Sequence, residues 1–304
     1  GFVMFTCPPI LPYFTPLPAL SLQGEANLGI PAWLAAVEAD LDKALASGTP
    51  IRQVVMGRCC AIDSMMAALF ELYELDQTDL TLFATGGYGR GELHPFSDVD
   101  LLLLSPNPID EALNQKISPF VARLWDIGID PALVVRSVEE CDEACHDDIT
   151  VATSLLEARI LAGNVAQAGL PMQLLNKNWS QTKFYEAKMA EAKERYLKHN
   201  STEYNLEPDL KNAPGGLRDI HTVGWISKRY FRVTNLFGLV QQEFITEKEF
   251  DELQEAEDFL WLIRHHLHKI AKRNENRVLF DYQRLIAERI GYRDNSHPNA
   301  AVEH

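Results

Sequence analysis

The sequence predicts an α+β protein in which a small core of strands and helices is followed by an all-α part. Apolar residues recur with helical spacing up to about residue 75, and short apolar runs typical of strands occur between residues 80 and 136. Beyond Gln173 only helical patterns remain. The 304 residues are 46% hydrophobic, which suffices for about two domains. We therefore expect an arm and helix over 1–50, the core over 51–172 and helices over 173–304.

Two helices are expected before the first strand. The first runs from Pro31 to Ala46, because proline suits a first helical turn and Gly48 suits the stop. The second covers Ile51 to Leu75. The proline-broken apolar stretch over residues 1–20 has no preceding Lys or Arg. It therefore predicts an irregular surface arm and not a signal peptide.

The core alternates strands and helices. Three apolar runs predict strands: Leu80–Ala84, Val99–Leu104 and Ile129–Arg136. A helix is expected over Ile109–Ile127, where Pro119 must kink or split it. Another helix is expected over Thr150–Leu161, closed by Gly163. This order predicts a core of about a hundred residues.

The C-terminal part is predicted to be helical throughout. Four helices are expected: Ser180–His199, Gly216–Phe231, a long one from Thr246 through Ala271, and a last one before Gly291. Thr246 and Glu249 have the spacing of a capping box. The patterns place Trp225 and Trp261 in the core, and His265, His266 and His268 on a solvated face.

Composition narrows the classes of partner. The net charge of −15 repels phosphate backbones and so disfavours nucleic acid as a main partner. No run approaches the roughly 18 uncharged apolar residues of a membrane span. The five cysteines are odd in number and contain no C-x-x-C pair, which predicts a reduced, cytoplasmic chain. Cys141, Cys145 and His146 lack the fourth ligand that a zinc site needs.

Two carboxylates stand at the start of a buried strand. Asp98 and Asp100 are two residues apart, so both side chains point to the same side of the strand. Two bare carboxylates there would repel each other. A hard divalent cation removes this conflict, and Mg²⁺ prefers carboxylate ligands. The pair therefore predicts a metal site.

A glycine-rich loop precedes these carboxylates. Gly86 and Gly87 follow the first strand, and glycine lets main-chain N–H groups approach an anion closely. Arg90, in the same loop, could bind a phosphate oxygen. A phosphate-binding loop beside metal-binding carboxylates predicts a site for a nucleoside triphosphate.

The segment "GGYGRGE…SDVDLLLL" resembles the signature of the polymerase-beta nucleotidyltransferase superfamily. This resemblance implies a small mixed sheet with helices and a third carboxylate from a later strand. Asp130 occupies the corresponding place, and Glu139, Glu140 and Asp126 are the rivals.

Residues 204–231, "YNLEPDLKNAPGGLRDIHTVGWISKRYF", resemble the bacterial PII uridylyltransferases, which are bifunctional uridylyltransferase/uridylyl-removing enzymes. The resemblance implies transfer of UMP from UTP to a tyrosine of the PII protein with two Mg²⁺ ions. Asp98, Asp100 and Asp130 would be the catalytic metal ligands. Lys211, Arg218 and Asp219, at a predicted helix start, would help to bind the nucleotide, unless Arg218 and Asp219 form structural ion pairs.

The chain departs from that family in two respects. Residues 131–134 read Pro-Ala-Leu-Val where the family has a Gly-His-Ser type sequence. The family's hydrolase and glutamine-sensing domains would follow this segment, and His146-Asp147 is the only HD dipeptide. We therefore expect no uridylyl-removing activity from this chain. Two other functions stay open: transfer to another acceptor, such as glutamine synthetase or an RNA end, and nucleotide sensing without transfer.

Overall fold

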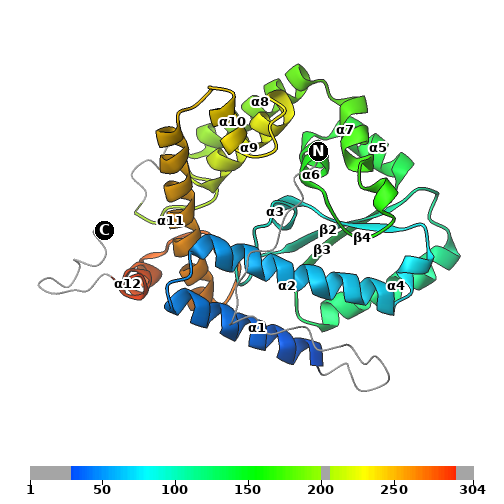
Figure 1. Cartoon of the computed structure of the whole chain (residues 1–304), viewed down its shortest axis with the longest axis horizontal. Coiled ribbons are helices and arrows are strands. Elements are labelled where there is room, and N and C mark those ends of the chain that lie inside the picture. The colour runs from blue at the N-terminus through cyan, green and yellow to red at the C-terminus, as the bar shows by residue number, and fades with distance from the viewer. Residues whose placement is uncertain (1–28, 200–205, 292–304) are drawn as a thin grey trace, which may run out of the picture. The chain divides into compact units, whose positions relative to one another are not determined.

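A computed structural model describes residues 29–199 and 206–291 (Figure 1). Its chain contacts divide into two compact units. One unit contains the sheet and comprises described residues 29–93 and 97–180. The other is helical and comprises 94–96, 181–199 and 206–291. The predicted N-terminal arm lies outside the described residues.

The sheet unit is built on four strands. Its helices are α1 (Gly29–Ala46), α2 (Ile51–Leu72), α3 (Gly86–Gly89), α4 (Glu111–Asp126), α5 (Val138–Asp147), α6 (Ile149–Glu157) and α7 (Leu170–Asn178). Its strands are β1 (Thr81–Ala84), β2 (Val99–Ser105), β3 (Pro131–Ser137) and β4 (Arg159–Gly163). They form one mixed sheet in the order β3-β2-β1-β4. β1 is antiparallel to both β2 and β4, whereas β2 and β3 are parallel. The predicted α+β class is confirmed.

Residues Arg159–Gly163 form strand β4, whereas the sequence predicts a helix through Leu161. Helix α6 ends at Glu157, and the chain from Arg159 pairs with β1. A short apolar stretch can form either a helix or a strand. Here it forms a strand because the free edge of β1 offers backbone hydrogen bonds. Gly163 ends β4 with a φ of +107°, and its α-carbon lies so close to β1 that a Cβ would be 2.5 Å from the Leu80 carbonyl oxygen.

Helix α4 also differs from expectation. It continues from Glu111 to Asp126 across Pro119, so the proline does not split it. The side chains of Ile117, Phe120 and Leu124 are buried on both sides of the proline. Packing of this apolar face stabilises the helix despite the missing backbone hydrogen bond.

Helices α1 and α2 lie side by side, and α2 crosses the sheet (Figure 1). Arg58 of α2 joins them through an ion pair with Glu38 of α1. α2 is long and apolar enough to span a membrane by composition, but 67% of its apolar window is buried inside the protein, as in a core helix. Cys59 of α2 is a buried free thiol, as are Cys141 and Cys145 of α5.

The helical unit contains α8 (Gln181–His199), α9 (Leu217–Tyr230), α10 (Phe237–Gln241), α11 (Glu247–Ala271) and α12 (Phe280–Arg289). The predicted capping box of Thr246 and Glu249 is present at the start of α11. Trp225 and Trp261 are buried as expected, with 4% and 2% of their surface exposed.

The histidines of α11 are buried, which corrects the prediction of a solvated face. His265, His266 and His268 are 1%, 8% and 0% exposed. His268 accepts a hydrogen bond at Nδ1 from the Phe96 backbone N–H, over 3.1 Å and 172 residues of sequence. Because the covering segment is so distant in the chain, the helical period alone could not indicate this burial.

Candidate nucleotide and metal site

The glycine loop, residues 85–92, contains the single helical turn α3 and directly contacts Asp100 of the carboxylate pair. Gly86 follows β1 with a φ of +54°, which glycine adopts readily. A Cβ at this position would lie 2.4 Å from Oδ2 of Asp100. The Thr85 backbone N–H also donates to the Asp100 carbonyl oxygen at 3.0 Å. The loop backbone therefore packs directly against the Asp100 carboxylate.

Asp98 and Asp130 meet at the adjacent ends of the two parallel strands. Val99 and Pro131 are register partners, and the Val99 N–H donates to the Asp130 carbonyl oxygen at 2.9 Å. The two exposed side chains share a hydrogen bond, which is the main cause that raises the pKa of Asp130 above its usual value. Two carboxyl groups that share a proton occupy a place where a cation could bridge them.

The chemistry of these donors fits a divalent cation, but a complete site is not preformed. In 29–199 and 206–291, no group of three or more His, Cys, Asp or Glu side chains is placed to hold a metal ion. The set Asp98, Asp100 and Asp130 therefore stays a prediction. Among the rivals, Glu140 closes a capping box with Ser137 at the start of α5, and Asp126 is the last residue of α4. Both side chains belong to helix ends.

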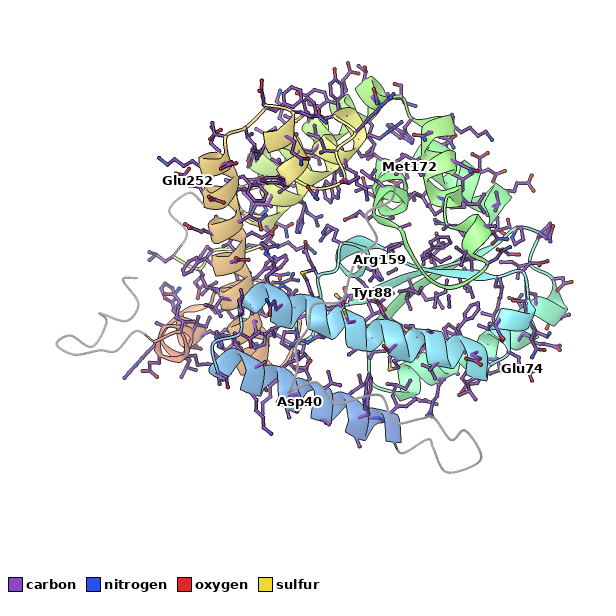
Figure 2. All side chains as sticks on the ribbon, in the orientation of Figure 1. Asp40, Glu74, Tyr88, Arg159, Met172 and Glu252 are labelled. Carbon is purple, nitrogen blue, oxygen red and sulfur yellow. The ribbon has the colours of Figure 1, made fainter. Side chains whose placement is uncertain are left out.

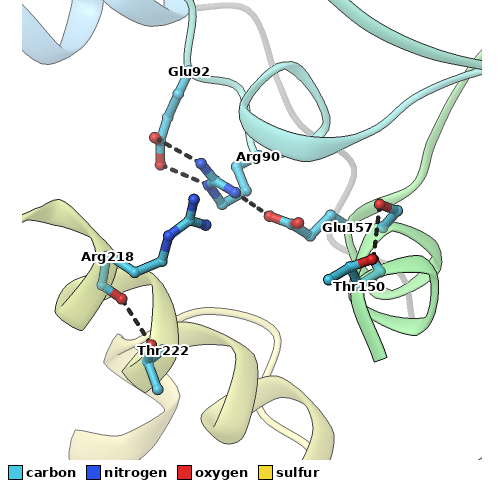
Figure 3. Close-up of polar contacts among 7 residues, drawn as sticks. Arg90, Glu92, Thr150, Glu157, Arg218 and Thr222 are labelled. Carbon is cyan, nitrogen blue, oxygen red and sulfur yellow. Dashed lines mark hydrogen bonds and ion pairs between the residues drawn. The ribbon is translucent and has the colours of Figure 1, made fainter. Parts of the chain in front are cut away.

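Arg90 is engaged by acidic neighbours. Its guanidinium forms ion pairs with Glu157 of α6 and with Glu92, the latter at 3.3 Å (Figure 3). Although burial acts to lower it, the charges of Glu157 and Glu92 hold the pKa of Arg90 above its usual value. Because Glu157 and Glu92 already neutralise this charge, a phosphate would have to compete with these two carboxylates for Arg90. Phosphate binding by Arg90 stays a prediction. Glu157 lies 67 residues from Arg90, so no local sequence pattern indicates this ion pair.

The contact between Gly86 and Asp100 can be tested by the substitution Gly86→Ala, which adds one methyl group. We expect Gly86→Ala to lower nucleotidyl transfer at least about a hundredfold, because the new Cβ displaces the Asp100 carboxylate and alanine disfavours a positive φ. Gly224→Ala in α9 is the control, since its Cβ would meet nothing within 4 Å. Steady-state rates of the two variants measure the effect. Equal rates for Gly86→Ala and the parent would contradict this placement of Asp100.

The second predicted nucleotide-binding segment lies in the helical unit, before and at the start of α9. The Arg218 N–H donates to the Lys211 carbonyl oxygen at 2.8 Å, so these two residues are neighbours. The Arg218 guanidinium lies 5.4 Å from the centre of the Trp225 ring. Gly216 allows this tight loop, because a Cβ there would be 2.7 Å from the Leu210 carbonyl oxygen. A nucleotide-binding role for Lys211 and Arg218 stays a prediction.

Asp219 makes structural contacts within the same unit. It accepts hydrogen bonds from Arg195 at 2.6 Å, from the Tyr196 hydroxyl at 2.8 Å and from the Gly215 N–H at 2.7 Å. Although burial alone would raise it, the bonds from Arg195 and Tyr196 hold the pKa of Asp219 below its usual range. These contacts are the structural ion pairs and hydrogen bonds that the sequence left open as an alternative role for Asp219. Nucleotide binding by Asp219 stays a prediction.

The contacts of Asp219 predict a pH-dependent stability. We expect Asp219→Asn to lower the free energy of unfolding by about 2 kcal/mol at pH 7, a typical loss for hydrogen bonds to a charged group. Because the folded pKa is lowered, this stabilisation is present above the unfolded pKa of about 4 and is lost as the pH falls through the folded pKa. Urea unfolding at pH 7 and pH 3 measures both differences, with Glu255→Gln on the exposed face of α11 as control. A difference that persists undiminished at pH 3 would exclude the carboxylate charge as its source.

Residues 67–152, which contain the glycine loop and the carboxylate pair, match the nucleotidyltransferase domain family. Residues 183–304 match the family described as GlnD PII-uridylyltransferase. Over 99% of its length the chain is similar to proteins named bifunctional uridylyltransferase/uridylyl-removing enzyme.

Three relatives illustrate the similarity, and each is named a bifunctional uridylyltransferase/uridylyl-removing enzyme. The protein of Psychrobacter sp. strain PRwf-1 is 58% identical over 99% of this chain, and the match covers 34% of that protein. The Psychrobacter arcticus protein is 54% identical over 99% of the chain and 35% of its own length. The Acinetobacter baumannii protein of strain ATCC 17978 is 49% identical over 86% of the chain and 29% of its own length. The chain thus spans about a third of the length of these relatives.

Proposed function

We propose that this chain transfers UMP from UTP to a tyrosine hydroxyl of the PII signal protein in the cytoplasm and releases pyrophosphate. The direct packing of the Gly86 backbone on the Asp100 carboxylate carries the proposal. It puts a loop that can bind phosphate beside a carboxylate that can bind a metal. The relatives' printed names support uridylyl transfer, and the family description supports PII as the acceptor.

The proposed chemistry assigns a role to each carboxylate. Asp98, Asp100 and Asp130 would hold two Mg²⁺ ions, which stabilise negative charge on the triphosphate when bound. Asp98 and Asp100 fix the metal-bound nucleotide at the start of β2. Asp130 accepts the proton of the attacking tyrosine hydroxyl.

The backbone of the loop binds the other part of the nucleotide. Main-chain N–H groups around Gly86 and Gly87 would donate to phosphate oxygens, because neither residue has a side chain that obstructs an anion. Lys211 and Arg218 would add positive charge from the segment at the start of α9. The overall charge of −15 disfavours an RNA acceptor and is compatible with a protein acceptor.

Label transfer tests the proposal directly. The chain is incubated with Mg²⁺, PII and either UTP or ATP labelled in the α-phosphate, and protein-bound label is measured. Labelling of PII by UTP, lost when the acceptor tyrosine is changed to phenylalanine, is the expected result. Faster labelling by ATP would indicate an adenylyltransferase. Tight UTP binding with no label on PII would instead favour nucleotide sensing.

A further inference from the structure

We propose that Arg159 is a positioning residue that holds the glycine loop in the shape that binds the triphosphate. Arg159 is the first residue of β4, the strand that the sequence pattern did not reveal. Its register partner is Ala84, the last residue of β1 before the loop. This inference rests on the proposed function, because it assigns the loop to UTP.

The guanidinium of Arg159 joins three elements. Nη1 and Nη2 donate to the two carboxylate oxygens of Asp63 in α2, at 2.6 and 3.1 Å. Nη2 also donates to the carbonyl oxygen of Tyr88, inside the loop, at 3.0 Å. The guanidinium carbon lies 5.3 Å from the centre of the Tyr88 ring. Arg159 therefore contacts both the backbone and the side chain of the residue at the centre of the loop. Figure 2 shows Tyr88 and Arg159 together beside α2.

Tyr88 transmits this anchoring to the glycines. Its ring is fully buried, and burial together with the nearby Asp63 carboxylate raises the pKa of its hydroxyl. Tyr88 lies between Gly87 and Gly89, so its fixed ring and carbonyl leave little freedom to the peptide groups on either side. Glycine has the largest conformational freedom to lose, so a loop of glycines needs such an anchor to be preorganised.

The turn from α6 into β4 restrains the loop at a second point. A Cβ on Gly89 would lie 2.4 Å from the Glu157 carbonyl oxygen, and the Glu157 carboxylate forms the ion pair with Arg90. Residues 157–159 thus contact three successive residues of the loop, Tyr88, Gly89 and Arg90. None of these contacts gives Arg159 a direct role toward substrate, so its role is to position the loop.

Arginine geometry makes the proposal testable with a conservative change. Lysine keeps the charge but has a single nitrogen, so Arg159→Lys cannot bind both Asp63 oxygens and the Tyr88 carbonyl together. The loop holds the nucleotide equally in the ground and transition states, so its loosening raises KM and leaves kcat nearly unchanged. We expect the KM for UTP to rise about tenfold and kcat to change less than about threefold.

Hydrogen exchange reports on the loop without any ligand. The N–H groups of Gly89, Arg90 and Glu92 donate to carbonyl oxygens of the same loop, at 2.7, 3.1 and 2.8 Å. We expect faster exchange over residues 85–92 in Arg159→Lys. Asp63→Asn, which leaves the arginine in place, is the second variant and is expected to have the same effect. The matched control is Glu38→Gln, because Glu38 is the carboxylate partner of Arg58, another arginine that pairs with a carboxylate of α1 or α2.

The two measurements separate the inference from the proposed function. Faster loop exchange together with a raised KM in Arg159→Lys and Asp63→Asn, and neither in Glu38→Gln, supports the proposal. Unchanged loop exchange in Arg159→Lys overturns it, as does an equal KM increase in Glu38→Gln. If the parent chain transfers no UMP, the proposed function fails, and loop exchange alone decides whether Arg159 positions the loop.

Discussion

Replacing Asp98 or Asp100 with asparagine is expected to lower UMP transfer about a thousandfold, which corresponds to roughly 4 kcal/mol of activation free energy. Asparagine keeps the size of the side chain and removes the charge that would hold a cation. The Asp100→Asn variant also lacks the carboxylate against which Gly86 packs. The effect is therefore expected in catalysis, with the fold preserved.

Initial rates and thermal unfolding of both variants measure this prediction. Asp126→Asn is the matched control, because Asp126 is an exposed aspartate at the end of α4 and is expected to leave the rate unchanged. In the presence of a metal chelator, Asp98→Asn is expected to unfold at the same temperature as the parent or at a slightly higher one. The reason is that the substitution removes the charge repulsion between residues 98 and 130. A rate within tenfold of the parent for either variant would remove that aspartate from the site.

Replacing Asp130 with asparagine is expected to lower turnover sharply while UTP binding stays nearly unchanged. In the proposed site, Asp98, Asp100 and the glycine loop would hold the Mg²⁺-bound nucleotide. Only the attacking hydroxyl requires the third carboxylate, so the loss belongs to the transition state. Calorimetric titration of UTP and single-turnover transfer measure the two quantities separately.

Glu139→Gln is the control for Asp130, because Glu139 is the nearby rival in the first turn of α5. Equal losses of binding and rate in Asp130→Asn would indicate a structural role for Asp130. An unimpaired rate in Asp130→Asn together with a large loss in Glu139→Gln would transfer the third carboxylate to Glu139.

The site motifs could be predicted because they depend on local spacing. Gly86, Asp98 and Asp100 lie within fifteen residues of each other, and a strand period of two suffices to align the aspartates. Asp130 was indicated by the family resemblance, which implies a third carboxylate from a later strand, and in the structure the residues that follow Asp98 and Asp130, Val99 and Pro131, are register partners. The shared hydrogen bond of Asp98 and Asp130 depends on this register, which no local pattern encodes.

The supports of the site could not be predicted for the same reason. Strand β4 exists because β1 offers an open edge, and Arg159 reaches Tyr88 across 71 residues of sequence. Likewise, the burial of His268 depends on Phe96, which belongs to a distant loop. In each case a contact between residues far apart in the sequence determines the structure. The local sequence alone favours a helix for residues 159–161 and a solvated position for His268.

We propose that Asp98, Asp100 and Asp130 form one metal-binding set. The most direct test counts the Mn²⁺ ions, in place of Mg²⁺, bound per chain in the presence of a non-hydrolysable UTP analogue, by paramagnetic resonance of free and bound metal. Two ions are expected for the parent chain, one for Asp130→Asn, and fewer than two for Asp98→Asn. Equal numbers of bound ions in the parent and both variants would contradict the claim.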